Sequence, residues 1–284
     1  MARQPEAPKI SYTCNCGSQR YMLQMAVDNL RAFIDGVQAG GRLFFSADEI
    51  PRAEGSRALE AALRRLAKKG AIRRLLPKTP AFVIVPPEHR TMGLPPVEWW
   101  LDDLMTHLGQ DYYLGLLSAA AASGSSHFSP METQVVTTKW IRPIENGRHR
   151  IRFFQKAAIP KKFVSTRQGA WGPLRISSPA LTAFDLVIYP VCSPAQTRLI
   201  LADLAATIST TDLLKIIEER RDVPAAQRLG LLLDRARASK LANPVRAWLR
   251  GRSTVPVDLE PNAGPGKTDD KWNVRVNVDL EATA

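Results

Sequence analysis

The sequence predicts an α+β protein with two domains. A small N-terminal domain of helices and a hairpin is followed by a mixed α/β domain with a short-stranded sheet and several helices. The length of 284 residues suits one large domain or two ordinary ones, and a hydrophobic fraction of 45% is typical of globular proteins. Apolar residues recur at helical spacing through much of the chain, whereas residues 133–176 hold four short strand-like runs.

Charge is distributed unevenly along the chain. Residues 1–93 contain 15 basic and 8 acidic residues, residues 94–138 contain 5 acids and no Lys or Arg, and residues 139–175 contain 10 basic residues and 1 acid. The net charge of +12 and the pI near 10.0 favour a polyanion as partner. No apolar run approaches the length of a membrane span and the N-terminus has no signal-peptide pattern, so we expect a cytoplasmic protein.

Prolines and composition mark the domain boundaries. Residues 1–18 are rich in Pro and polar residues and are predicted to form a flexible N-terminal arm. Residues 19–93 form the first predicted domain and residues 94–284 the second. Between Pro86 and Pro96 the chain is punctuated by proline, and the stiffness of such a linker limits the relative motion of two domains.

No metal or cofactor site is predicted. The three cysteines are Cys14, Cys16 and Cys192, and an odd count without a signal peptide fits a reducing compartment. A structural zinc site usually needs four ligands, so Cys14 and Cys16 are interpreted as free thiols. The chain lacks a Walker loop, a dinucleotide fingerprint, a nucleophile elbow and a nuclease-like acid cluster, so we predict no cofactor and no catalytic residue.

The first domain begins with two predicted helices. The first starts at Gln19, carries apolar residues at helical spacing and ends at Gly40. The second is short, starts at Ser46 and is closed by Pro51. Ser46 and Glu49 match a capping box, in which each side chain accepts a hydrogen bond from the backbone amide of the other residue.

The third predicted helix, from residue 56, opens the most strongly charged stretch of the chain. Residues 56–78 contain eight basic residues and a single acid, Glu60. One stripe of this helix carries three leucines, Leu59, Leu63 and Leu66. Basic residues line the opposite stripe. Gly70 ends the helix. Two apolar runs follow, at residues 72–76 and 82–85, and their proline-flanked connection predicts a β-hairpin with a basic tip.

Three helices, the third of them basic, followed by a hairpin are the order of a winged helix-turn-helix. The third helix of this motif suits a DNA major groove and the wing suits the adjacent backbone. The predicted DNA-binding residues lie on the helix and the wing: Arg57, Arg64, Arg65, Lys68, Arg73, Arg74 and Lys78. The alternative is an ordinary helix with a solvated basic face, but the charge is nearly all of one sign, without the acid partners that usually accompany such a face.

The second domain is predicted to open with two helices, over residues 97–108 and 111–122, the second capped by Asp111. Short strands are predicted at residues 134–138, 150–154, 163–166 and 174–176. Basic and apolar side chains alternate along the second of these strands, so Arg150 and Arg152 face one side. A second basic surface is predicted from these strands: Arg148, Arg150, Arg152, Lys161 and Lys162. It is either a solvated sheet surface or a second surface that binds a polyanion. The polyanion would be flanking DNA, RNA or an acidic partner.

Helices dominate the rest of the chain. Ser178 and Pro179 form a cap and an N1 proline, which predict a helix start. Asp185 on this helix is interpreted as a buried structural acid, because no second carboxylate lies at a useful spacing. Four further helices are predicted, over residues 197–208, 211–221, 225–241 and 244–250. A late hairpin is predicted from residues 255–259 and 272–280.

The order of these segments resembles the AbiEi antitoxins of bacterial type IV toxin–antitoxin systems, which act in abortive infection, a phage defence. The resemblance covers about residues 19–278. It rests on the basic winged helix, the Arg-rich sheet and two sequence stretches: Tyr112-Tyr113-Leu114-Gly115-Leu116-Leu117-Ser118-Ala119-Ala120 and Ser178-Pro179-Ala180-Leu181-Thr182-Ala183-Phe184-Asp185-Leu186. It implies an N-terminal domain that represses the shared promoter by binding double-stranded operator DNA. It also implies a C-terminal domain that antagonises a nucleotidyltransferase-like toxin without a stable complex.

Two other classes stay open from the residues alone. A winged-helix transcription factor with a ligand-sensing second domain would need a pocket lined by Trp99, Trp100 and Tyr112. A nucleic-acid-processing enzyme would need two or three carboxylates in a basic groove, which the sequence does not show. Both a monomer in solution and a dimer on DNA are compatible with the sequence. The N-terminal arm with Cys14 and Cys16 is not part of the family pattern.

Overall fold

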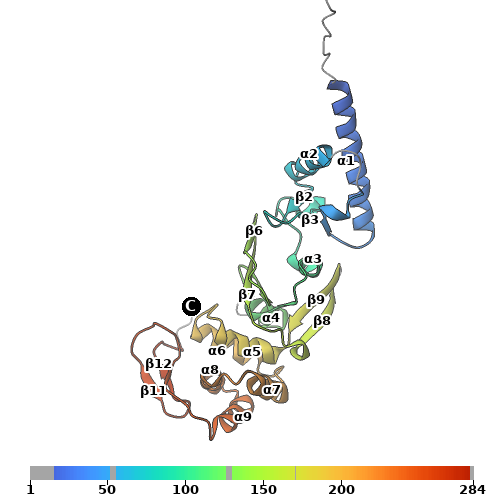
Figure 1. The fold of residues 1–284 in the computed structure, drawn as a ribbon. Coiled ribbons are helices and arrows are strands. Elements are labelled where there is room, and N and C mark those ends of the chain that lie inside the picture. The colour runs from blue at the N-terminus through green and yellow to red at the C-terminus, as the bar shows by residue number, and fades with distance from the viewer. Residues whose placement is uncertain (1–15, 52–55, 126–129, 170, 282–284) are drawn as a thin grey trace, which may run out of the picture. The chain divides into compact units, whose positions relative to one another are not determined.

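The computed structural model describes residues 16–51, 56–125, 130–169 and 171–281, with residues 16–23 and 56 described by their backbone alone. The chain divides into two compact units, the first ending at Arg90 and the second beginning at Thr91 (Figure 1). No helix within the described ranges is both long and apolar enough to cross a bilayer.

The first unit contains two α-helices and a three-stranded antiparallel sheet. Helix α1 spans Cys16–Ala39 and α2 spans Ser56–Lys68. Strands β1 (Phe44–Ser46), β2 (Ile72–Arg74) and β3 (Ala81–Ile84) lie in the order β1-β3-β2. The core of this unit draws buried apolar side chains from all five elements: Leu30, Ile34, Phe45, Leu63, Leu66, Ile72 and Phe82.

The predicted hairpin of this unit is confirmed. Strands β2 and β3 pair antiparallel, with Ile72 opposite Ile84. Gly70 lies between α2 and β2 with a φ of 69°, a left-handed conformation that glycine adopts without steric cost. Leu63 and Leu66 are buried, so the leucine stripe of α2 faces the core and the basic stripe faces outward.

Two expectations for the N-terminal region are corrected. Helix α1 begins at Cys16, so residues 16–18 are helical rather than part of the predicted arm, because neither Gly17 nor Ser18 forbids a helical backbone. The predicted second helix is a single 3-10 turn, η1 (Ala47–Glu49), because Ile50, which precedes a proline, already has an extended backbone. Its capping box is present. Residues 52–55 and the part of the predicted N-terminal arm that contains Cys14 lie outside the described residues.

The second unit contains a six-stranded mixed sheet. Its strands are β4 (Tyr112–Leu114), β5 (Thr133–Thr137), β6 (Ile144–Asn146), β7 (His149–Gln155), β8 (Val164–Gly169) and β9 (Gly172–Ser177). They lie in the order β6-β7-β5-β4-β9-β8. Strand β5 pairs parallel with β7 and antiparallel with β4, and β4 pairs parallel with β9. The four predicted strands are β5, β7, β8 and β9, whereas β4 and β6 were not predicted.

The predicted helix over residues 111–122 is wrong in its first half. Tyr112–Leu114 forms β4 in the middle of the sheet, and α4 spans only Leu116–Ala122. The aromatic pair favours an extended backbone, and ladders from β5 and β9 on both sides hold it there. Leu116 has a φ of 53°, and this left-handed residue makes the sharp turn from strand to helix.

The predicted helix over residues 97–108 is interrupted at Trp100. A 3-10 turn, η3 (Val97–Trp99), precedes α3 (Leu101–His107), because Trp100 has a φ of −143°. Trp100 is buried and its Nε1 donates to the carbonyl of Pro95 at 3.2 Å. Trp99 stacks on Trp171, with ring centroids 5.6 Å apart. Both tryptophans therefore serve as packing residues.

The two faces of the six-stranded sheet pack against different helices. Tyr113 of β4 lies opposite Val136 of β5, and Val136 lies opposite Phe154 of β7, so these side chains share a face. That face contributes to the main core together with the helices that follow the sheet. On the other face, the hydroxyl of Tyr112 donates to Asp102 of α3 at 3.0 Å.

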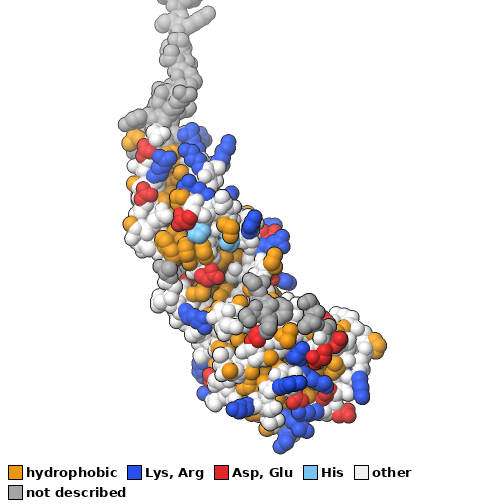
Figure 2. Space-filling view, turned by 180° about the vertical axis from the view of Figure 1, so that it is seen from behind, with side chains coloured by type: hydrophobic (Ala, Val, Ile, Leu, Met, Phe, Trp, Pro, Cys, Tyr) orange, Lys and Arg blue, Asp and Glu red, His pale blue; other side chains and the backbone are white. Residues whose placement is uncertain are grey.

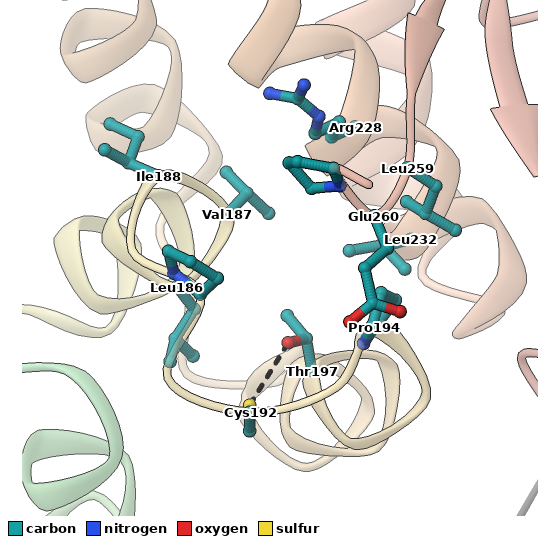
Figure 3. Close-up of a pocket in the computed structure, with 12 residues that line it drawn as sticks. Leu186, Val187, Ile188, Cys192, Pro194, Thr197, Arg228, Leu232, Leu259 and Glu260 are labelled. Atoms are coloured by element: carbon teal, nitrogen blue, oxygen red, sulfur yellow. Dashed lines mark hydrogen bonds between the residues drawn. The ribbon is translucent and has the colours of Figure 1, made fainter. Parts of the chain in front are cut away.

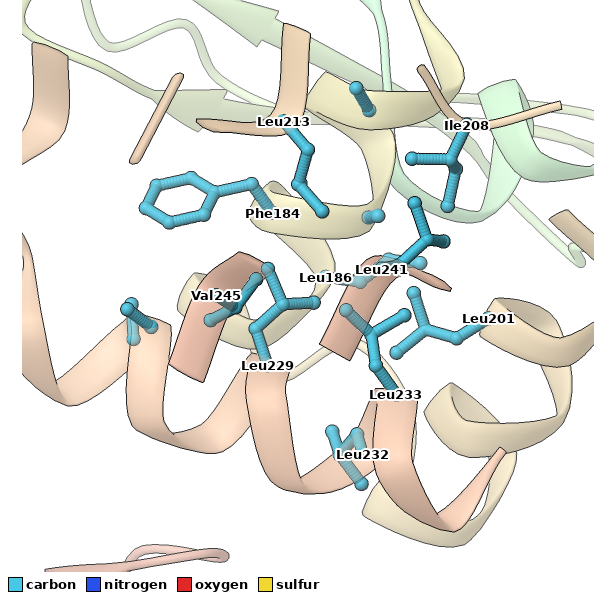
Figure 4. Close-up of a cluster of buried hydrophobic side chains, with 14 of the residues drawn as sticks. Phe184, Leu186, Leu201, Ile208, Leu213, Leu229, Leu232, Leu233, Leu241 and Val245 are labelled. Carbon is cyan, nitrogen blue, oxygen red and sulfur yellow. The ribbon is translucent and has the colours of Figure 1, made fainter. Parts of the chain in front are cut away.

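Five helices enclose the main core with the sheet. They are α5 (Pro179–Ile188), α6 (Pro194–Leu204), α7 (Thr210–Arg220), α8 (Val223–Arg235) and α9 (Ser239–Leu249). Phe184, Leu201, Leu229 and Val245, from four of these helices, point toward one another in Figure 4. Ser178 caps α5 as predicted, since its hydroxyl accepts a hydrogen bond from the Leu181 amide at 3.3 Å.

The boundary between the last two helices is corrected. The predicted helices over residues 225–241 and 244–250 are replaced by α8 and α9, because Arg237 takes a left-handed φ of 58° and ends the first of them early. Pro244 lies inside α9 rather than at its start, where the missing amide removes a single backbone hydrogen bond.

The late hairpin is also wrong. Strands β10 (Val257–Asp258) and β12 (Val274–Val276) pair in parallel, and β11 (Lys267–Asp269) pairs antiparallel with β12. The buried Gln227 of α8 explains this arrangement, because its Nε2 donates to carbonyls in both predicted strands. The acceptors are Val255, Trp272 and Asn273.

Candidate functional site

The basic residues of α2 form an exposed surface, which we call the α2 basic face: Arg57, Arg64, Arg65 and Lys68. The Arg64 side chain is 84% exposed. A group of Lys and Arg side chains covers one side of the first unit in Figure 2. One acid intervenes, since Glu60 lies 3.7 Å from Arg64, which corrects the expectation of a face without i,i+4 partners. Such an exposed pair contributes little, so both side chains can exchange it for another partner.

The basic residues of the hairpin differ in their freedom to contact a partner. Lys78 is exposed at the tip between β2 and β3. The Nε of Arg74 donates to the carbonyl of Thr79 at 3.3 Å, so this side chain is held along the wing. Arg73 is only half exposed, and its Nε is buried without a hydrogen-bond partner among the described residues. The α2 basic face therefore presents more freely exposed cations than the hairpin does.

The second basic surface is less uniform than the period-two alternation predicts. Arg150 and Arg152 are exposed and Ile151 is buried, as expected. However, the face that carries these arginines also carries Phe154, which packs in the main core, and Lys156, which is buried. The prediction of a wholly outward basic face is therefore corrected, because the helical layer covers the second half of that face.

Several cations of this surface are paired with acids from elsewhere in the chain. Arg152 lies 3.7 Å from Glu132, Lys161 lies 2.7 Å from Asp111, and Lys162 lies 3.9 Å from Glu219. Positive and negative side chains are interspersed over the second unit in Figure 2. The acidic segment of residues 94–138 thus neutralises part of the basic segment that follows it.

Arg175 shows the same neutralisation at a partly buried site. Its guanidinium lies 3.4 Å from Asp102 and 3.4 Å from Asp111, and it covers the Tyr112 ring at 5.5 Å. Burial raises the pKa of Tyr112, and the neighbouring Asp102 carboxylate raises it further. By contrast, Arg148 and Arg150 are exposed and form no ion pair with the described residues.

A buried polar centre joins three elements of the second unit. Lys156, which follows β7, donates from Nζ to Asp185 of α5 at 2.5 Å and to the hydroxyl of Tyr113 of β4 at 3.0 Å. The Tyr113 hydroxyl donates to the second carboxylate oxygen of Asp185 at 2.5 Å. Asp185 is fully buried, so its interpretation as a hydrogen-bonded structural acid is confirmed.

Burial dominates the electrostatics of this centre. It lowers the pKa of Lys156, and although the Asp185 carboxylate opposes this shift, the net direction is downward. Burial also raises the pKa of Tyr113, and Asp185 adds to the increase. Because Lys156 and Asp185 are 5% and 0% exposed, a substrate has no access to them, and the centre fixes β4, β7 and α5 relative to one another.

Two observations on the described residues concern metal binding and thiol chemistry. No group of three or more His, Cys, Asp or Glu side chains among them is arranged to hold a metal ion. Cys192 lines a pocket between α5, α6 and α8, shown in Figure 3, and lies 3.3 Å from the hydroxyl of Thr197. Burial raises the pKa of the Cys192 thiol, which disfavours the reactive thiolate.

Comparison with known proteins finds a match within the second unit. Residues 113–235 match the family model described as the AbiEi antitoxin C-terminal domain. This segment of the second unit is similar to an antitoxin domain. The resemblance predicted from the sequence is confirmed for this segment. The matched segment begins at Tyr113 and contains both Lys156 and Asp185, so the buried polar centre lies entirely within it.

The fold also has a counterpart among solved structures. The chain is similar to the crystal structure of the RV2827C protein from Mycobacterium tuberculosis, with a TM-score of 0.60 and 16% sequence identity. The similarity covers 85% of this chain and 89% of that chain, and at this identity it concerns the fold alone. No curated protein matches the chain.

Sequence reasoning missed the role of Lys156 in the buried polar centre. A lysine is rarely buried, so its place in a basic stretch suggested an exposed side chain. One signal was available: Lys156 continues the even-numbered series of Arg150, Arg152 and Phe154. Period two therefore assigns it to the face of Phe154, where a buried cation requires a carboxylate partner.

Proposed function

We propose that this chain is a DNA-binding transcriptional repressor and an antitoxin of a type IV toxin–antitoxin system. The observation that carries the proposal is the AbiEi antitoxin domain at residues 113–235. In this proposal the first unit binds the operator of its own operon, and residues from about 94 onward counteract a co-encoded nucleotidyltransferase-like toxin. Both activities are binding activities in the cytoplasm, and neither uses a cofactor or a catalytic residue of this chain.

The first unit supports operator binding as a winged helix-turn-helix. Its helical segments α1, η1 and α2 precede the β2–β3 hairpin, and β1 completes the antiparallel sheet. This order matches that motif, in which the last helix enters the major groove and the hairpin follows the backbone. The α2 basic face lies opposite the buried Leu63 and Leu66, so the helix can present its cations to phosphates and base edges while its back stays in the core.

Operator binding is tested by charge reversal on the α2 basic face. We expect Arg64→Glu with Lys68→Glu to abolish binding to duplex DNA from upstream of the chain's own coding sequence, with an unchanged circular dichroism spectrum. The matched control reverses Lys240 and Arg246, two exposed cations of α9 that form no ion pair with the described residues. Normal binding by the α2 variant would refute this part of the proposal.

The antitoxin activity is assigned to the second unit. A cationic surface is available there, because Arg148 and Arg150 are exposed and unpaired among the described residues. We propose that antagonism does not require a stable complex with the toxin, as the AbiEi resemblance implies. The ligand-sensing alternative is not favoured, because Trp100 and Tyr112 are each 1% exposed and Trp99 stacks on Trp171.

Antitoxin activity is tested by co-expression with the toxin under an unrelated promoter. The full chain should restore growth, residues 1–93 alone should not, and Arg148→Ser, Arg150→Ser and Arg152→Ser together should weaken the rescue. The control carries Lys240→Ser, Arg246→Ser and Arg250→Ser, which remove the same charge from α9 and its C-cap. Rescue by residues 1–93 would overturn the division of labour between the two units.

A further inference from the structure

The loop between β5 and β6, residues 138–143, presents an unusually exposed tryptophan. The Trp140 side chain is 71% exposed, whereas the other five tryptophans of the chain are buried or half-buried. The Trp140 indole makes no hydrogen bond, ion pair or ring contact with the described residues. Leaving so large an apolar surface in water has a free-energy cost of roughly 25 cal/mol per Å2, which contact with a partner would remove.

The neighbours of Trp140 in this loop are cationic. Lys139 precedes it and Arg142 follows it by two positions, and both side chains are exposed. Neither forms an ion pair with a described carboxylate, in contrast to Arg152, Lys161 and Arg175 of the same unit. The loop itself contains no acidic residue. Its local field is therefore positive and unneutralised.

The start of the loop is held in place by the sheet. The hydroxyl of Thr137 donates to the carbonyl of Lys139 at 2.6 Å, and the side-chain amide of Gln155 donates to the carbonyl of Thr138 at 3.4 Å. The backbone amide of Lys156 donates to the carbonyl of Thr137 at 2.9 Å. Trp140 thus projects from a segment anchored on the end of β7, which reduces the ordering cost of binding.

Further unpaired cations extend this positive surface along the edge of the sheet. Strand β6 is the edge strand, and Asn146 pairs with His149 at the far end of β7 from Gln155. Arg148 lies in the turn at that far end, and Arg150 lies two residues further on, opposite the exposed Glu145 of β6. At about 3.3 Å per residue, the seven residues of β7 span roughly 20 Å, so the cations are spaced over the length of several nucleotides.

We propose that Trp140 is a stacking platform for an unpaired base of single-stranded nucleic acid, with Lys139, Arg142, Arg148 and Arg150 contacting the phosphates. Aromatic side chains within a cationic surface bind single strands in this way, and the stacking tolerates any base. A protein hot spot is less well matched, because lysine is depleted at protein interfaces, whereas Lys139 lies directly beside Trp140. The site does not depend on duplex binding by the α2 basic face.

The test measures binding of a fluorescein-labelled 12-nucleotide oligouridylate to the full chain by fluorescence anisotropy at 50 mM salt. We expect binding by the parent, and a loss of about 5- to 150-fold for Trp140→Ala, the range for one stacked base. Trp140→Phe should stay within about threefold of the parent, because it keeps a π face. Trp140→Leu should resemble Trp140→Ala.

The control is Met131→Ala, since Met131 is 91% exposed and lies before β5, away from the loop. This variant should bind as the parent does. Equal binding by Trp140→Ala and the parent, or equal binding by the Leu and Phe variants, overturns the proposal. So does a Trp140→Ala variant that loses toxin rescue but binds the oligonucleotide normally, which would identify a protein contact. Trp140→Ala should leave the affinity for operator duplex unchanged. A failure of the single-strand stacking proposal is therefore distinguishable from a failure of operator binding by the α2 basic face.

Discussion

The Nζ of Lys156 lies 2.5 Å from the Oδ1 of Asp185, and both side chains are removed from solvent. The two residues are 29 positions apart and lie on different layers of the second unit. Tyr113 completes the centre through hydrogen bonds to both. A buried ion pair of this kind adds little net stability when intact, but the loss of one partner leaves an uncompensated charge.

We therefore predict that Lys156→Met destabilises the second unit by about 3–5 kcal/mol, because the Asp185 carboxylate then stays buried and unpaired. The double variant Lys156→Met with Asp185→Leu should be less destabilised than Lys156→Met alone. Arg150→Met, on the same face of β7 but exposed, should change stability by less than about 0.5 kcal/mol. Urea unfolding followed by circular dichroism measures all three. A cost for Lys156→Met as small as that for Arg150→Met would contradict the prediction.

The buried tyrosines predict a pH dependence above neutrality. Burial raises the pKa of Tyr189 to about 12 and raises the pKa values of Tyr112 and Tyr113 as well. Since their folded pKa values exceed the unfolded value near 10, their stabilising contribution is complete below about pH 10 and is lost as the pH rises further.

Ultraviolet titration at 295 nm should accordingly show that Tyr112, Tyr113 and Tyr189 do not ionise at pH 10.5 in the folded protein. In denaturant all five tyrosines of the chain should titrate near pH 10. Tyr113→Phe should remove part of the difference between the two titrations. Complete ionisation in the folded state at pH 10.5 would be inconsistent with the buried centre.

Gly230 of α8 gives a steric prediction. A Cβ at this position would lie 2.0 Å from the Trp272 ring, which packs against the helix. We predict that Gly230→Ala lowers stability by about 1–3 kcal/mol or more, because a ring enclosed by the core has little room to shift. Gly36 is the control: it lies within α1 and a Cβ there meets nothing within 4 Å, so Gly36→Ala should stabilise α1 by about 0.5–1 kcal/mol. Thermal unfolding measures both, and a neutral Gly230→Ala would show that Trp272 has room to move.

The α2 basic face predicts a specific salt dependence of operator binding. Each phosphate contact contributes about −0.9 to the slope of log affinity against log salt. Lys68→Ala should make the slope less steep by about 0.9, the contribution of one phosphate contact. It should weaken binding similarly for operator and unrelated duplexes. Lys240→Ala, an exposed change on α9, should leave the slope unchanged. A slope near zero for the parent would rule out phosphate contact as the source of affinity.

Local signals in the sequence were sufficient for elements whose stability is local. The capping box of Ser46 and Glu49, the Ser178 cap of α5 and the β2–β3 hairpin were predicted from residues close together in the chain. The stretch from Tyr112 to Ala120 and the one around Asp185 were sufficient for the AbiEi resemblance, which the match to residues 113–235 confirms.

Only the tertiary structure decided which charges are free and which segments pair. Asp111, predicted as a helix cap, instead pairs with Lys161 and Arg175, and the expected hairpin of β10 and β12 is a parallel pair held by Gln227. Ion pairs and parallel strands join residues far apart in the chain, so their energies depend on packing that no local pattern encodes. For the same reason the buried Lys156 and the exposed Trp140 were assigned their environments by the fold rather than by their neighbours in sequence.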